Sequence, residues 1–532
     1  MNTAQAALPG SGDSVSRFNV SKWALDHPAL TRYLLVVLML LGLAAYFQLG
    51  QDEDPPFTFR AMVVRAYWPG ATAQQVADQV TDKLEKTLQE VPYADKIRSY
   101  SKPGETLIIF QVQDSSPPKE MAQIWYTVRK KIGDMRGTLP AGVVGPFFND
   151  EFGDVYGSIY SLSSDGFSYE ELKEHADRVR QRLLQVQHVN KVEIFGAQQE
   201  KIFIEIPQKR LAQLGLDFGS VIAQIGQQNA VESAGVIDSP TDYLQVRVGG
   251  QFNSVQDLEQ FPIRAGGASF RLGDIATIKR AYVDPPQVKV RDGGKEVLAL
   301  GISMAKGGDI IEMGKALKMA TEAIRAELPV GIEMQQFQDQ STVVARSVGE
   351  FIAVLIEAVV IVLAVSFISL GLHFKPFRID WRPGMVVGIT IPLVLAITFV
   401  TMYYWGVGLH KISLGSLIIA LGLLVDDAII AVEMMVRKLE EGYDKVRAAT
   451  FAYEATAMPM LTGTLITAVG FLPIGLAKST VGEYTFAIFA VTAAALLISW
   501  LVSVYFVPYL GTRLLKTKPH AAGDQPHELF DT

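Results

Sequence analysis

The chain of 532 residues contains no cysteine. This absence excludes disulfide bonds, thiolate catalysis and cysteine-based zinc or iron–sulfur sites. The sequence also lacks the G-x-S-x-G, H-E-x-x-H and Walker A patterns, and its seven histidines are scattered without the spacing of a metal site. We therefore expect no cofactor, no metal and no direct use of ATP.

The chain also has no excess of positive charge, since 48 Lys and Arg residues face 55 Asp and Glu residues and the formal net charge is −7. Nucleic acid is therefore not an expected partner. The chain is too long for one hydrophobic core, so several domains are expected. A hydrophobic content of 49% suits a membrane protein that carries a large water-exposed part.

Long apolar segments occur at two places, one near the N-terminus and five in the C-terminal half. Each is close to the roughly 20 residues that cross the hydrocarbon of a bilayer. The first has no small-residue cleavage site after it and reads as a retained anchor. Lys and Arg gather in alternate loops, which places both termini in the cytoplasm and residues 50–345 outside. The predicted spans are 30–48, 350–371, 383–403, 412–434, 456–476 and 484–509.

The outside segment alternates strands and helices. Its first part has the β-α-β-β-α order that is typical of a split βαβ, ferredoxin-like unit. The predicted elements are a strand at 59–67, a helix at 71–91, strands at 94–101 and 105–113, and a helix at 118–136.

A similar order begins again at residue 156, as a weak repeat of pattern rather than of residues. Residues 207–285 read as an insertion with short helices and strands. The predicted elements around it are a strand at 156–163, a helix at 168–186, strands at 189–195 and 201–206, a strand at 296–304, a helix at 308–328 and a strand at 332–337.

Two adjacent carboxylates, Asp426 and Asp427, lie in the middle of the apolar run 412–433. Each costs about 2.5–3.5 kcal/mol at the centre of a bilayer helix. A neighbouring Leu, Ile or Val returns only about 0.3–0.6 kcal/mol. This helix should therefore face protein or water, and the default interpretation is an ion or proton site.

Other acidic residues extend this interpretation. Adjacent helical residues are about 100° apart, so Asp426 and Asp427 cannot point at one partner but can line one polar seam. Glu357 is a second buried carboxylate, on another span, and is a further proton-relay candidate. The alternative to a proton-relay role is a static ion pair with a basic residue. This alternative is about as plausible for Glu357 and less plausible for the two aspartates. None of the six predicted spans carries a central Lys or Arg.

Several short motifs follow the pattern of one known family. They are 52–57 (D-E-D-P-P-F), 67–71 (Y-W-P-G-A), 192–196 (V-E-I-F-G), 272–276 (L-G-D-I-A), 339–342 (D-Q-S-T) and 422–430 (G-L-L-V-D-D-A-I-I). Together with the one-plus-five arrangement of spans, they make the chain resemble the N-terminal half of a resistance–nodulation–division (RND) permease. The similarity is greatest to the hydrophobe/amphiphile efflux branch.

The resemblance implies an α-helical membrane protein with an α+β periplasmic domain. Asp426 and Asp427 match the proton-relay pair on the family's fourth span. Phe195 matches a drug-pocket phenylalanine and Phe337 lies next to another pocket position, although a core role is about as plausible for both. The implied divisions are a cytoplasmic 1–29, a first span 30–49, a first porter subdomain 50–150, a second porter subdomain 151–206 and 286–345, a docking subdomain 207–285, five spans within 346–510 and a cytoplasmic tail 511–532.

The resemblance also implies a function, which is proton-driven export of amphiphilic compounds across the inner membrane. Such permeases form homotrimers with a periplasmic adaptor and an outer-membrane channel, and the proton-motive force is their energy source. Family members are about twice this length, and their relay lysine lies in the C-terminal half. We therefore expect a fragment or a split gene product. The alternatives are a metal-ion or lipid exporter of the same superfamily, and a non-transporting interaction subunit or inactive fragment.

Overall fold

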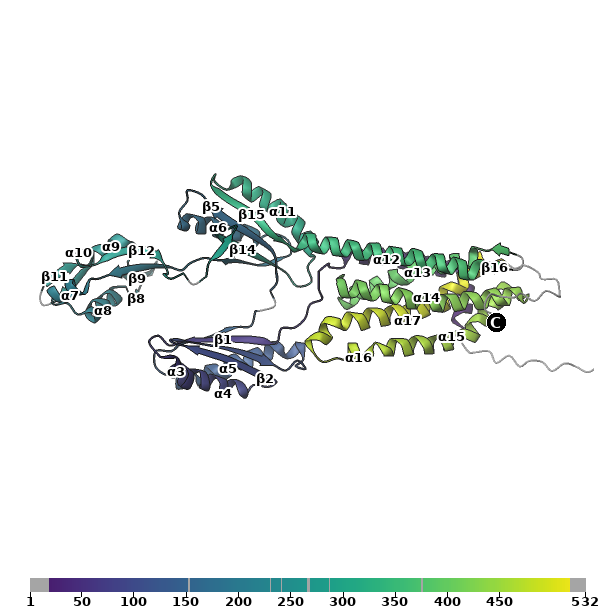
Figure 1. The fold of residues 1–532 in the computed structure, drawn as a ribbon, viewed down its shortest axis with the longest axis horizontal. Helices are drawn as coiled ribbons and strands as arrows, with labels where there is room; N and C mark the ends of the chain where they lie inside the picture. Colours follow the sequence, from purple (N-terminus) through teal and green to yellow (C-terminus); the bar gives the residue numbers. More distant parts are fainter. Residues whose placement is uncertain are drawn as a thin grey trace, which may run out of the picture.

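The computed structural model describes residues 19–151, 154–229, 231–240, 242–265, 268–286, 288–374 and 377–516. It combines long apolar helices with mixed α/β units, and Figure 1 shows the helices gathered at one end of the molecule. The outer parts of the predicted cytoplasmic ends, 1–18 and 517–532, lie outside the described residues, as does Lys375.

The helices of the bundle come from the two places that the apolar segments predict. Five of them, α2, α12, α13, α14 and α17, are long and apolar enough to cross a membrane. Helix α15 covers residues 456–470 of the predicted fifth span, 456–476, but is not in this group, and its first turns carry Lys445, Arg447 and Glu454. The bundle consists of α1 (Val20–Asp26), α2 (Pro28–Gln48), α12 (Gln340–Gly371), α13 (Arg382–Trp405), α14 (Lys411–Glu440), α15 (Lys445–Gly470), α16 (Leu472–Gly475) and α17 (Thr480–Leu514). A short hairpin, β16 (Leu372–Phe374) and β17 (Phe377–Ile379), joins α12 to α13.

Helix α14 is the central element of the bundle. It packs against α12, α13, α15 and α17, with the most extensive contact on α17. Its first turn is closed by a capping box, in which Ser413 N–H donates to His410 Nδ1 (3.2 Å) and His410 N–H donates to Ser413 Oγ (3.0 Å). Small and aliphatic side chains such as Leu417, Ala420 and Leu424 fill its buried face.

The first α/β unit is a four-stranded antiparallel sheet in the order β2-β3-β1-β4. Alternate residues such as Val64, Ile108 and Phe110 point into a core closed by the helices. The unit consists of β1 (Ala61–Tyr67), α3 (Ala73–Val76), a π turn (Ala77–Thr81), α4 (Asp82–Gln89), β2 (Ala94–Lys102), β3 (Glu105–Val112), α5 (Met121–Met135) and β4 (Val144–Asn149). Short 3₁₀ turns flank α5 at Pro118–Glu120 and Arg136–Thr138. Strand β4 was not predicted, because Gly145 and Pro146 favour a turn; it is an edge strand, where proline is tolerated.

The second α/β unit repeats the same order of strands. In it β14 lies between β6 and β5, and β15 pairs with the far side of β5. The repeat predicted from the pattern is thus confirmed at the level of topology. The elements are β5 (Tyr156–Ser164), α6 (Tyr169–Leu183), β6 (Val189–Phe195), β13 (Val290–Asp292), β14 (Lys295–Met304), α11 (Ile310–Glu327) and β15 (Ile332–Asp339).

One strand was assigned to the wrong sheet. The strand predicted at 201–206 is β7 (Glu200–Glu205), and it pairs with β12 (Thr277–Tyr282) instead of joining the second unit. Both edges of β14 are already occupied, by β5 on one side and by β6 and β13 on the other. Its hydrogen bonds therefore group strand β7 with the inserted segment.

The inserted segment has a small core of its own. Leu211, Val221, Leu258, Ile263 and Leu272 form its centre. Figure 1 places it at the end of the molecule opposite the helix bundle, with the two α/β units between them. Its elements are α7 (Gln208–Gln213), α8 (Phe218–Gln228), β8 (Val231–Asp238), β9 (Tyr243–Gly249), α9 (Val255–Gln260), β10 (Pro262–Ala265), β11 (Ala268–Arg271) and α10 (Leu272–Ile275).

Candidate functional site

Asp427 lies in the interior of the bundle, near the middle of α14. Its side chain is buried and faces α15, where the Thr464 hydroxyl oxygen lies 3.2 Å from Oδ2. The same hydroxyl lies 2.9 Å from the carbonyl oxygen of Met460. Asp427 is therefore a buried carboxyl group with one neutral hydroxyl partner from a neighbouring helix.

The Thr464 hydroxyl can satisfy both protonation states of Asp427. It carries one proton and two lone pairs. It donates to an ionised Asp427, or it accepts from a neutral Asp427 while donating to the Met460 carbonyl oxygen. Neither state leaves a buried polar group without a partner, so the geometry suits a carboxyl group that gains and loses a proton.

Asp426 lies on a different face of α14 from Asp427. It is exposed, as are Ile419, Gly422, Ile430 and Glu433, which follow the same helical stripe. Residues three and four apart share one face of a helix, which explains the stripe. Asp427 therefore has a buried partner, Thr464, whereas Asp426 lies on a surface that the rest of the described chain leaves uncovered.

Neither aspartate has a cationic partner among the residues that the structure describes. The nearest charged contacts on α14 lie at its ends, where Lys411 pairs with Glu53 and Lys438 pairs with Glu441. This agrees with the absence of central Lys and Arg residues from the predicted spans. The described chain supplies the carboxylates and a hydroxyl partner for one of them.

Glu357 is not buried, which corrects the expectation that it is a second buried carboxylate. It is exposed on α12, and only 11% of the apolar window of that helix is buried. Within the described ranges no hydrogen bond or ion pair joins Glu357 to either aspartate. The reason is that α12 lies at the edge of the bundle, where most of its apolar residues are not covered by another helix of the described chain.

Phe195 and Phe337 lie on β6 and β15, with β14 and β5 between them. Phe195 is half-buried and packs edge-on against Tyr156, with 5.2 Å between the ring centroids. Phe337 is 51% exposed, next to an irregularity in the pairing of β15 with β5. The sheet therefore separates these two pocket candidates.

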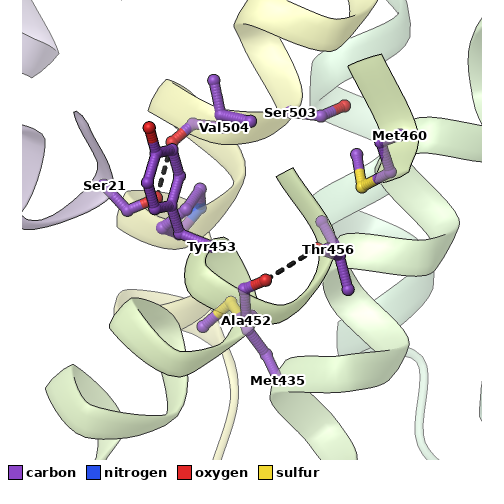
Figure 2. A pocket seen from close by; sticks show the side chains of 10 residues that line it. Ser21, Met435, Ala452, Tyr453, Thr456, Met460, Ser503 and Val504 are labelled. Carbon is purple, nitrogen blue, oxygen red and sulfur yellow. Dashed lines mark hydrogen bonds between the residues drawn. The ribbon is translucent and has the colours of Figure 1, made fainter. Parts of the chain in front are cut away.

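A small cavity, not anticipated from the sequence, opens between α1, α14, α15 and α17 (Figure 2). Its volume of about 10 Å³ is close to the minimum that holds one water molecule. Ala431, one turn beyond Asp427, contributes to its wall, as do Thr456 and Ser503. The Ser503 hydroxyl is buried without a hydrogen-bond partner in the described part of the chain.

Thr464 is the site residue that sequence reasoning missed. The signal was a pair of threonines, Thr462 and Thr464, in the apolar part of α15, but many threonines in apolar helices only bond to their own backbone. Thr462 does so, with its hydroxyl 2.9 Å from the Met458 carbonyl oxygen. Only the packing of α15 on α14 distinguishes Thr464 from Thr462.

Comparison with known proteins identifies the family. The model described as the AcrB/AcrD/AcrF family matches residues 20–531. The chain is 27% identical over 500 residues to Multidrug resistance protein MdtC of Yersinia enterocolitica, covering 93% of this chain and 48% of that protein. It is 28% identical over 501 residues to MdtC of Cronobacter sakazakii, covering 92% and 47%, respectively. The chain thus spans about half the length of these curated relatives. The RND resemblance is confirmed, and the chain belongs to the AcrB/AcrD/AcrF family.

Proposed function

We propose that this chain forms the N-terminal half of a proton-driven exporter of amphiphilic compounds. The observation that carries the proposal is Asp427, a buried carboxyl group in a long apolar helix, bonded to Thr464 in a geometry that suits both protonation states. The matched relatives are named multidrug resistance proteins, which favours organic compounds as substrates.

The proposed arrangement places six helices in the inner membrane and both α/β units in the periplasm. In it α15 is the fifth span, supported by its packing on α14 and α17. The units at 50–150 and at 151–206 with 286–345 act as porter subdomains, and 207–285 acts as a docking subdomain. The pairing of β7 with β12 favours a docking subdomain that begins at β7.

The uncovered stripe of α14 supports a second half, from the same or a separate chain. An exposed carboxylate such as Asp426 is costly against lipid, by about 2.5–3.5 kcal/mol at the bilayer centre. A helix that carries Lys or Arg, packed over Gly422 and Asp426, would remove this cost. Protonation of the aspartates would then weaken an ion pair and change how the two halves pack.

The energy source is the proton-motive force. One proton that crosses a potential of 100 mV provides about 2.3 kcal/mol, which is enough to bias a conformational equilibrium by more than tenfold. In the proposed assembly three permeases join a periplasmic adaptor and an outer-membrane channel, and the porter subdomains open and close around the substrate as the aspartates change protonation state.

Substitution of Asp427 tests the proposal. Cells that express the complete permease containing this chain are loaded with ethidium, and the initial rate of export is measured. Asp427→Asn is expected to abolish export, since an amide cannot exchange a proton. Glu441→Gln, at the exposed end of the same helix, is the matched control and should export like the parent. Export by Asp427→Asn at the parent rate would contradict the proposal.

A further inference from the structure

The segment from Gly50 to Arg60, which we name the outer strap, runs from the end of α2 to the start of β1. It contains the D-E-D-P-P-F motif, for which the proposed function so far gives no role. Gln51 forms a parallel bridge with Leu409, just before α14. Two backbone bonds support it, from Leu409 N–H to the Gly50 carbonyl oxygen (2.9 Å) and from Asp52 N–H to the Leu409 carbonyl oxygen (3.1 Å).

Glu53 ties this strap to the first residues of two bundle helices. Its Oε1 accepts from Lys411 Nζ at 2.5 Å, and its Oε2 accepts from Gln340 Nε2 at 2.9 Å. Lys411 begins α14 and Gln340 begins α12. The Lys411 ammonium and the Gln340 amide hold the pKa of Glu53 below its usual range, so Glu53 stays ionised at neutral pH.

The same strap holds the second α/β unit. Ile310 N–H, at the start of α11, donates to the Gln51 carbonyl oxygen (3.1 Å). Gly50 packs so closely that a Cβ there would lie 3.0 Å from the Gly308 carbonyl oxygen. One short segment therefore contacts α14 and α11 through its backbone and α12 through the Glu53 side chain.

The far end of the strap joins the first α/β unit to α17. The buried Arg60 guanidinium forms an ion pair with Glu483 and donates to the Ser116 carbonyl oxygen (3.0 Å). Thr58 N–H donates to Glu483 Oε2 (2.9 Å), and the Tyr484 hydroxyl donates to Asp54 (2.6 Å). Deeper in the bundle, α17 packs along α14. The strap thus contacts the starts of α11, α12, α14 and α17, and Arg60 also reaches Ser116 in the first α/β unit.

We infer that Glu53 is a positioning residue that transmits movement of the carboxylate-bearing helix α14 to α12 and the second α/β unit. This inference rests on the proposed function, because it concerns how protonation of Asp427 is communicated. Glu53 holds the first turns of α14 and α12 to the strap. A shift of α14 therefore moves the strap, and the bond between Gln51 and the start of α11 passes this movement to the second α/β unit.

Spin labels test this transmission in the complete permease that contains this chain, with any cysteine of the second half replaced by serine. The chain has no cysteine, so Met319→Cys on α11 and Tyr404→Cys at the end of α13 give two labels without background thiols. Both side chains are well exposed, at 70% and 80%. The distance between the labels is measured by electron–electron resonance in lipid nanodiscs at about pH 8 and about pH 5.5. Glu53 stays ionised and His410 stays neutral over most of this range, because their pKa values are lowered.

The expected result is a pH-dependent change of distance that Asp427→Asn abolishes and that Glu53→Ala greatly reduces. The exchange variant Glu53→Lys with Lys411→Glu should restore the change, since it rebuilds the ion pair with reversed charges. Gly408→Ala gives a second route, because its Cβ would lie 2.8 Å from the Gly50 carbonyl oxygen and separate the strap from α14 without altering a charge.

Two variants serve as matched controls. Glu441→Gln removes an ion pair of the same 2.5 Å length at the other end of α14, and Gly133→Ala adds a Cβ that would meet no side chain or backbone of the described residues within 4 Å. Both should respond like the parent. A full response in Glu53→Ala and Gly408→Ala, with Asp427→Asn unresponsive, would overturn the role of Glu53 alone. A parent that does not respond, or an Asp427→Asn variant that responds fully, would overturn the proposed function as well.

Discussion

At the scale of single residues, the Thr464 hydroxyl is the hydrogen-bond partner on which the proposed protonation and deprotonation of Asp427 depend. Replacing Thr464 with Val keeps the shape of the side chain and removes the donor that lies 3.2 Å from the carboxylate. A hydrogen bond to a charged group contributes about 1.5–3 kcal/mol. We therefore expect Thr464→Val to export at least tenfold more slowly than the parent in the ethidium assay, whereas Thr464→Ser keeps most of the rate. Equal rates for the Val and Ser variants would show that the hydroxyl has no role.

His410 makes stability depend on pH at the start of α14. It is buried, and burial lowers its pKa to about 4 from an ordinary value near 6.5. The unfolded chain therefore binds a proton on His410 more readily than the folded chain does. The folded state keeps its full stability above about pH 6.5 and loses stability as the pH falls towards 4. The loss amounts to at most about 3 kcal/mol.

The variant His410→Asn keeps a good N-cap and removes this titration. Thermal unfolding of the parent and the variant, followed between about pH 7.5 and pH 5, is the measurement. The parent should lose more stability than the variant on acidification. The same loss in both proteins would rule out His410 as the source.

Residue types alone anticipated Asp427 but not its surroundings. A carboxylate in an apolar run is costly wherever it lies, and that cost is readable from sequence. Which neighbour contacts it depends on the rotation of α15 against α14, and this follows from packing over the whole helix. For the same reason Glu357 was predicted to be a second buried carboxylate but is exposed at the edge of the bundle.

At the scale of helices and strands, close packing of α2 on α13 depends on Gly42. A Cβ at this position would lie 2.4 Å from the Ala396 Cβ, so no side chain fits without moving a helix. Overpacking of this kind costs about 1–3 kcal/mol. We expect Gly42→Ala and Gly42→Val to lower the unfolding temperature in detergent, and Ala396→Gly not to rescue them, because the new Cβ would also lie 2.5 Å from the Ala396 Cα. Gly415→Ala, with nothing within 4 Å, should leave the unfolding temperature unchanged.

Most elements could be predicted because their periodicity is strong. Strands β2 and β3 and helix α6 lie within a few residues of their predicted bounds. Strand β4 was missed because its Gly145–Pro146 pair resembles a turn, and β7 was grouped with the wrong sheet because pattern does not reveal which strand edge is free. Both failures concern pairing between distant segments, which local sequence does not encode.

At the scale of the whole molecule, the bundle has an uncovered face. Ile430 is 42% exposed on the same stripe as Asp426. If a second half packs there, Ile430→Cys reacts with a maleimide in this chain alone and is protected when the second half is present. Met319→Cys, at a well-exposed position on α11 of the second α/β unit, should react equally in both cases. Equal reactivity of Ile430→Cys with and without the second half would show that this face does not bind it.

The central claim, that Asp427 couples proton movement to export, is tested most directly by proton flux. The complete permease is placed in proteoliposomes that hold a pH-sensitive dye, and an amphiphilic substrate is added. We predict that substrate accelerates proton flux through the parent and that Asp427→Asn shows neither the acceleration nor substrate transport. Substrate-dependent proton flux in Asp427→Asn equal to that of the parent would contradict the account.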